Sequence, residues 1–135
     1  MSRTTLSGAL TEIHTLLADD PTQDVATPVA SLVTAGVSKV LNHEPGATGV
    51  PAPCAVTVEP VGIDPEFWPV RVRVYVSDGP GKLPQSRMVA AMVAIDDAFK
   101  AADAFGPSRW QSGWNEEIGC HVAFCDLMVG REDGF

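Results

Sequence analysis

The chain is short of basic residues and has no long apolar run. Of its 135 residues, 9 are Lys or Arg and 17 are Asp or Glu, which gives a formal net charge of −8. A protein that wraps nucleic acid needs a basic surface, and nine scattered cations do not easily supply one. No stretch approaches the roughly 18 consecutive apolar residues of a membrane-spanning helix. The composition therefore argues against a nucleic-acid-wrapping protein and against a transmembrane protein.

Cysteine is also scarce, with Cys54, Cys120 and Cys125 as the three in the chain. A small, odd number of cysteines is more typical of reduced, buried thiols than of a disulfide framework. The first ten residues contain one Arg and no continuous apolar region. We therefore expect no secretory signal and folding in a cytoplasm.

The hydrophobic content is ordinary, at 45% of residues. For a chain of this mass, size scaling predicts that about two-thirds of the surface is buried on folding, enough for a core without disulfides or metal. We expect a single domain over residues 1–135. Within it we predict a helical N-terminal segment at 1–36, a sheet with a long helix at 37–130, and a frayed tail at 131–135.

Apolar residues recur at helical spacing in two segments. The first predicts a helix from Thr5 to Ala18, with an apolar stripe formed by Leu6, Leu10, Ile13 and Leu17. The second predicts a longer helix that Gly106 and Pro107 end, with a stripe formed by Met88, Met92, Ile95, Phe99 and Ala102. For residues 22–36 we predict a further short helix.

Strict alternation marks one strong strand, at residues 70–76. Its valines, Val70, Val72, Val74 and Val76, share one face, and Arg71, Arg73 and Tyr75 share the other. Weaker strands are predicted at 37–42 and 54–59, and a closing hairpin at 110–129. Strands flanked by helices predict an α+β fold, with an antiparallel or mixed sheet of about four to five strands and two main helices packed on one face.

The motifs that could carry chemistry are incomplete. The GPGK segment at 79–82 lacks the first glycine and the Ser/Thr of a phosphate-binding loop. In a strand, Cys120 faces away from His121 and Cys125, so the three do not form a metal site. His14, on the polar flank of the first helix, and His43, at the head of a loop, have no nucleophile at a familiar spacing. We predict no catalytic residues, no metal and no cofactor.

Two surfaces have the mixed apolar and charged character of a subunit interface. One is the non-valine row of the strong strand, Arg71, Arg73 and Tyr75. The other is the flank of the long helix, where Val89 and Val93 lie beside Asp96, Asp97 and Lys100. The alternative is a solvated face with surface ion pairs. Trp68, Trp110 and Trp114 are expected in the core rather than in an interface.

The order of these segments resembles the tail terminator proteins of long-tailed bacteriophages, of the minor tail protein U type. The resemblance covers about residues 37–130 and is carried by PCAVTVEP (53–60), FWPVRVRVYVS (67–77), the helix SRMVAAMVAIDDAF (86–99) and the terminal hairpin. The chain departs from that pattern in residues 20–36, which look inserted between the first helix and the first strand.

The resemblance implies a virion structural protein rather than an enzyme. Such proteins form a homohexameric ring at the head-proximal end of the tail, after assembly in the host cytoplasm. The ring stops polymerisation of the tail tube protein and joins the tail to the head-tail connector (stopper) protein. DNA would pass through the acidic bore without specific binding. The alternatives are a stopper or adaptor, a tail tube subunit, or a small cytoplasmic enzyme or ligand-binding α+β domain.

Overall fold

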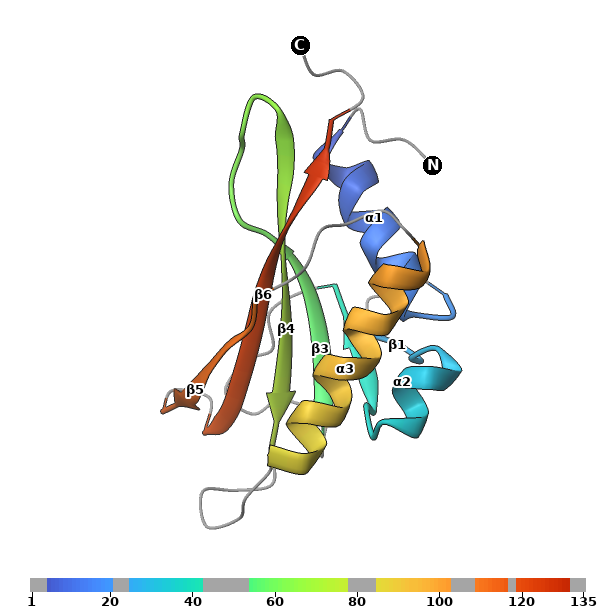
Figure 1. Ribbon diagram of the computed structural model, residues 1–135, viewed down its shortest axis with the longest axis vertical. Helices are drawn as coiled ribbons and strands as arrows, with labels where there is room; N and C mark the ends of the chain where they lie inside the picture. The colour runs from blue at the N-terminus through green and yellow to red at the C-terminus, as the bar shows by residue number, and fades with distance from the viewer. Residues whose placement is uncertain are drawn as a thin grey trace.

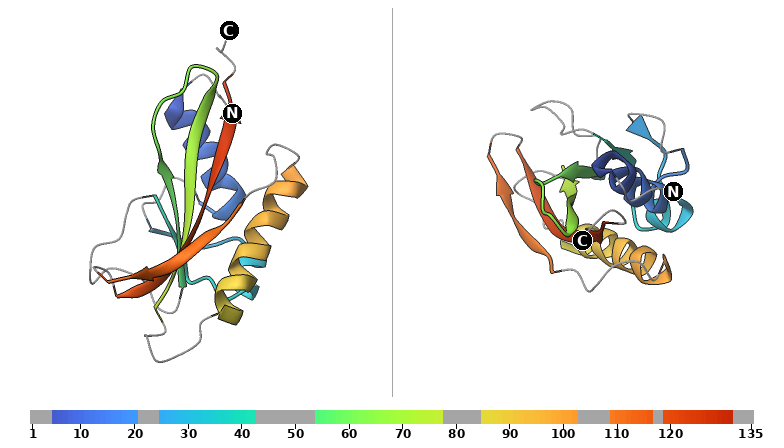
Figure 2. Two further views of the ribbon diagram at one scale, coloured as in Figure 1. Left: turned by 60° about the vertical axis from the view of Figure 1, so that its left-hand side comes forward. Right: turned by 90° about the horizontal axis from the view of Figure 1, so that it is seen from above.

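The computed structural model describes residues 5–20, 25–42, 54–77, 85–102, 109–116 and 119–131 (Figure 1). Within these ranges the chain forms one six-stranded mixed sheet with its helices on one face (Figures 1 and 2). This confirms the predicted α+β class and the helices on one side of the sheet. The sheet has one strand more than the upper end of the expected range.

The first helix, α1 (Leu6–Leu17), follows the predicted stripe. Thr5 caps it, because its hydroxyl oxygen accepts a hydrogen bond of 3.0 Å from the backbone N–H of Gly8. α2 (Ala30–Thr34) is short and is followed by Gly36, whose φ of +97° suits glycine. α3 (Gln85–Ala102) buries Met88, Ile95 and Phe99 along its inner side. The predicted stop at Gly106 and Pro107 lies outside the described residues.

The strands are arranged in the order β1-β2-β3-β4-β6-β5. Their bounds are β1 (Val25–Ala26), β2 (Lys39–Leu41), β3 (Cys54–Pro60), β4 (Phe67–Val76), β5 (Gln111–Asn115) and β6 (Cys120–Gly130). β2 and β3 run parallel, and the other neighbours run antiparallel. β4 lies at the centre, where Val72 is opposite Val58 of β3 and Cys125 of β6.

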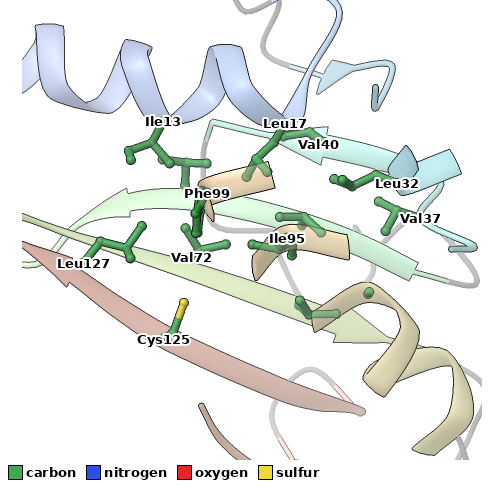
Figure 3. Packing of buried hydrophobic residues seen from close by; sticks show 14 of the residues in the cluster. Ile13, Leu17, Leu32, Val37, Val40, Val72, Ile95, Phe99, Cys125 and Leu127 are labelled. Carbon is green, nitrogen blue, oxygen red and sulfur yellow. The ribbon is translucent and has the colours of Figure 1, made fainter. Parts of the chain in front are cut away.

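The core lies between the sheet and the helices. α1 packs against β3 and β4, and α3 packs against β4 and α1. Figure 3 shows Ile13 and Leu17 of α1 and Ile95 and Phe99 of α3 directed toward the valine face of the sheet. All four alternating valines of β4 are fully buried, as predicted. Trp68 shares their face and is buried as well.

Two of the expected segment assignments need correction. The N-terminal segment is not only helical, because β1 pairs with β2 and forms one edge of the sheet. Residue 131 is not frayed, because the backbone N–H of Arg131 donates to the carbonyl oxygen of Glu66 at 3.2 Å. Residues 132–135 lie outside the described residues. In both segments the conformation is set by backbone pairing with residues that are distant in the sequence, and the local sequence does not reveal such pairing.

We predict that α3 contributes to stability through its inner side alone. Ile95→Ala removes a fully buried side chain and should lower the free energy of unfolding by about 2–5 kcal/mol. The matched change Val93→Ala, at a residue exposed on the same helix, should lower it by less than about 0.5 kcal/mol. Urea denaturation of both variants measures the difference. Equal losses would contradict the orientation of α3.

Candidate functional site

The face of the sheet opposite the helices, here called the outer face, carries paired charges. Arg71 of β4 binds Asp126 of β6 through two hydrogen bonds, of 2.7 Å to Oδ1 and 3.0 Å to Oδ2. This hydrogen bonding raises the pKa of Arg71 above its ordinary value. The guanidinium also lies 4.3 Å from the ring centre of Phe124. Arg71 is therefore held by its own chain.

Arg73 is paired in the same way, on the other side of β4. Its Nη1 donates to Oε2 of Glu59 at 2.6 Å. The hydroxyl of the buried Thr57 donates to the other carboxylate oxygen of Glu59 at 2.7 Å. Glu59 and Arg73 are both half-buried, so this network belongs to the folded chain rather than to a free charged surface.

The prediction that Tyr75 forms part of an exposed contact row needs a correction. Tyr75 lies on the outer face, as its position in the alternation predicts, but it is only 1% exposed. The predicted row of Arg71, Arg73 and Tyr75 therefore consists of two arginines paired within the chain and one buried tyrosine. As a contact surface for another subunit it is much less available than the sequence suggested.

The flank of α3 is exposed, as predicted. Val89 is 54% exposed and Val93 is 52% exposed, one helical turn apart. Asp97 and Lys100 are also exposed on this helix. Asp96 differs, because it is half-buried and accepts a hydrogen bond of 3.1 Å from the indole N–H of Trp110. The helix flank and the arginine row lie on opposite sides of the sheet.

The tryptophans have different surroundings. Trp68 is in the core with Arg131 stacked on its ring at 3.9 Å, and Trp110 is half-buried against the core. Trp114 is not a core residue, because it is exposed and meets His121 edge-on at 4.8 Å. β5, which carries it, is an edge strand, and in Figure 1 it lies at the lower left, on the other side of the picture from the helices. The shared parity of Trp110 and Trp114 did not reveal this.

Two surface features escaped the sequence analysis. One is an open hollow of about 670 Å³, where β5 lies beside the outer face of β4 and β6. Its lining includes Arg73, Tyr75, Gly113, Val122 and Phe124. The other is a set of exposed apolar side chains at the end of the sheet where β3 leads into β4: Val61 and Ile63 between β3 and β4, Phe67 on β4 and Met128 on β6. The isolated Ile63 between Gly62 and Asp64 was the available sequence signal for this set.

Groups that bind metals are dispersed in the part of the chain that the structure describes. No three His, Cys, Asp or Glu side chains gather there at a spacing that would hold an ion. The three cysteines are free and buried, as predicted. Burial raises the pKa of the Cys120 thiol. None of the described helices is long and apolar enough to cross a bilayer. His43 and the GPGK segment lie outside the described residues.

Among the described residues, His14 has surroundings that differ from the prediction. It does not lie on a polar flank but is buried, with 4% of its surface exposed. Within the described part of the chain its Nε2 has no hydrogen-bond partner, and burial lowers the pKa of the imidazole from its ordinary value of 6.5. It borders a hollow of about 200 Å³ whose described lining carries no carboxylate or cation: Ser7, Leu10, Thr11, Asn42, Val58 and Pro60.

We predict that the two outer-face arginines differ in their importance for stability. Arg73→Ala leaves the half-buried Glu59 carboxylate without its cation and should cost about 1–3 kcal/mol of unfolding free energy. Arg71→Ala breaks a more exposed ion pair and should cost about 0–1 kcal/mol. Thermal unfolding of the two single variants compares them. A larger loss for Arg71→Ala would contradict the burial of the Glu59 network.

A second prediction concerns pH. Because burial lowers the pKa of His14 in the folded state, the unfolded chain binds a proton more readily. The contribution of the neutral, buried His14 to the free energy of unfolding should be fully present above pH 6.5. It should decrease as the pH falls below that value, because the unfolded chain then takes up a proton at His14. His14→Leu should reduce this loss between about pH 6.5 and pH 5, a range above the ordinary carboxylate pKa values. Urea midpoints across this range measure it. Identical profiles for the two proteins would contradict the burial.

Comparison of the chain with protein families, with curated proteins and with solved structures finds no match.

Proposed function

We propose that the chain is the subunit of a homo-oligomeric ring, a phage tail terminator that caps the tail tube, stops its polymerisation and joins the tail to the head connector. The observation that carries the proposal is the exposed apolar flank of α3, with Val89 and Val93 more than half exposed on a helix whose opposite side is already packed.

The exposed side chains of this flank, Val89 and Val93, are not part of the hydrophobic core. α3 contributes Met88, Ile95 and Phe99 to the interior, and the valine face of β4 is covered. Single exposed apolar residues are common on proteins. Here two valines share one helix face, with the exposed Asp97 and Lys100 further along the helix. An apolar centre with a charged rim is the usual composition of an interface between proteins that fold separately.

A ring requires two different contact surfaces on each subunit, because each copy touches one neighbour with one surface and the other neighbour with another. Exposed apolar residues in the described part of the chain offer two candidate surfaces. Val89 and Val93 lie on α3, whereas Val61 and Ile63 lie between β3 and β4, with Phe67 on β4 and Met128 on β6. The number of six copies comes from the resemblance in segment order.

The charge is compatible with a ring around DNA. Each chain brings a net charge of −8, so a bore lined by several copies repels phosphate and does not retain the DNA that passes. The arginines play a different part from the expected one. Since Arg71 and Arg73 bind Asp126 and Glu59 of their own chain, we assign the subunit contact to the α3 flank and not to arginines that reach a neighbour's Asp96 and Asp97.

We predict that a double variant, Val89→Asp with Val93→Asp, abolishes assembly and keeps the fold, because it places two charges in the centre of the proposed contact. Val33→Asp, at a residue of α2 that is 52% exposed, is the matched control and should assemble like the wild type. Light scattering of the free protein, and electron microscopy of the protein mixed with tail tubes, provide the measurements.

The wild type should form rings, seen singly at the head-proximal tip of the tubes. A ring stacked along the whole tube would identify a tube subunit instead, and a ring bound only to the connector would identify a stopper or adaptor. Monomers under every condition, at high protein concentration and with tubes, would refute the ring.

A further inference from the structure

The sheet has an edge strand on each side, and the two edges differ in how they are protected. At the β1 edge, the chain that follows the strand is paired with the end of α1. There the backbone N–H of Asp19 donates to the carbonyl oxygen of Thr27 at 2.9 Å, and Ala18 forms a bridge with Pro28. Proline has no N–H to offer a further strand and is a common protection of sheet edges. With two residues in β1, this edge leaves little backbone for another strand.

The β5 edge has none of these protections in the part of the chain that the structure describes. β5 runs from Gln111 to Asn115, with the sequence QSGWN, and pairs with β6 on one side. It contains no charged residue and no proline, and its first four residues are exposed. Figure 2 shows this side of the sheet turned away from α1. An exposed edge without charge, proline or bulge is open to pairing with a further strand.

The charges around β5 favour a second copy of the same chain as that strand. Because each chain carries a net charge of −8, two copies repel each other over most of their surface. β5 is uncharged at all five positions. The residues that flank it, Arg109 before the strand and Glu116 after it, are exposed and of opposite sign. If two β5 strands run antiparallel, Arg109 of each copy lies close to Glu116 of the other, and the contact gains an attraction at both ends.

The side chains of β5 also match those of a second, antiparallel β5. With Gly113 opposite Gly113 of the second copy, Gln111 lies opposite Asn115 and Ser112 lies opposite Trp114. The two amides can each donate and accept a hydrogen bond, and the hydroxyl of serine can accept from an indole N–H. At the centre, nothing lies within 4 Å of the position of a Cβ atom on Gly113, so the two backbones can approach closely. The strand is therefore complementary to itself.

We propose that two copies of the chain pair through β5, antiparallel and about a two-fold axis at Gly113, so that their sheets join into one continuous sheet. This inference goes beyond the proposed ring. A two-fold contact is complete with two copies, whereas a ring contact joins two different surfaces head to tail. Since Val89 and Val93 lie on α3, pairing through β5 does not use them. Either contact can exist without the other.

Covalent trapping tests the two-fold axis. Directly opposite residues of an antiparallel pair have Cα atoms about 4.5–5.5 Å apart, a distance that a disulfide spans. Gly113→Cys should therefore link two copies on mild oxidation with diamide. A non-reducing gel should show a dimer and nothing larger, because the three native cysteines are buried. Ser112→Cys, at the exposed neighbouring position, is the matched control. It lies opposite Trp114 of the second copy and should give no dimer.

Charge reversal tests the antiparallel orientation. Arg109→Glu and Glu116→Arg, made singly, bring like charges together at both ends of the pair. Each should raise the dissociation constant of the dimer by about threefold to tenfold. A chain with both changes has opposite charges at both ends again and should return to within about twofold of the starting value. Sedimentation equilibrium measures these constants in a chain that also carries Val89→Asp and Val93→Asp, which removes the proposed ring contact. Circular dichroism checks that each variant is folded.

The outcomes separate this pairing from the ring. The absence of a dimer from Gly113→Cys, equal trapping through Ser112→Cys, or a double reversal no better than the single changes would each overturn the β5 pairing and leave the ring in place. A thiol of Gly113→Cys that forms no dimer, but is protected from alkylation when tail tubes are added, would identify a tube protein as the occupant and also overturn the pairing. A protein that pairs through β5 and never forms rings, alone or on tubes, would support the pairing and refute the ring.

Discussion

The register of β4 is the constraint on which the rest of this structure depends. β4 pairs with β3 and with β6 along most of its length, so its two-residue alternation also decides which side chains of both neighbours face the helices. Val72 lies between Val58 and Cys125, and all three are buried under α1 and α3. A slip by one residue would place arginines in the core, which the cost of burying unpaired charge forbids.

The same register explains the charge pairs of the outer face. Arg71 lies directly opposite both Glu59 of β3 and Asp126 of β6. It binds Asp126, and Glu59 turns diagonally to Arg73, whose direct neighbours are the uncharged Thr57 and Phe124. Two cations and two anions on three adjacent strands are thereby matched within the chain. This is why arginines that looked suited to a neighbouring subunit contribute instead to the fold.

Features set by short-range periodicity could be predicted, whereas features that depend on distant strands could not. The stripes of α1 and α3, the alternation of β4 and the exposed Val89 and Val93 follow from spacing alone. The Arg71–Asp126 pair depends on β6, because Asp126 lies 55 residues beyond Arg71. The buried Tyr75 likewise lies opposite Val122 of β6. His14 appeared polar because its surroundings include residues of β3, which the helix sequence does not contain.

The distribution of exposed apolar side chains has a consequence for the order of assembly. Since the inner stripes of the helices and the valine face of β4 form the core by themselves, the exposed side chains of the α3 flank contribute little to the folding of a single chain. Obligate oligomers differ, because their subunits lack a complete core. A subunit that folds on its own can remain a monomer at low concentration and join its neighbours when the copies are concentrated, either in solution or at the end of a tube. This behaviour suits the proposed terminator role, because a tube end that gathers the copies would favour the ring at that place.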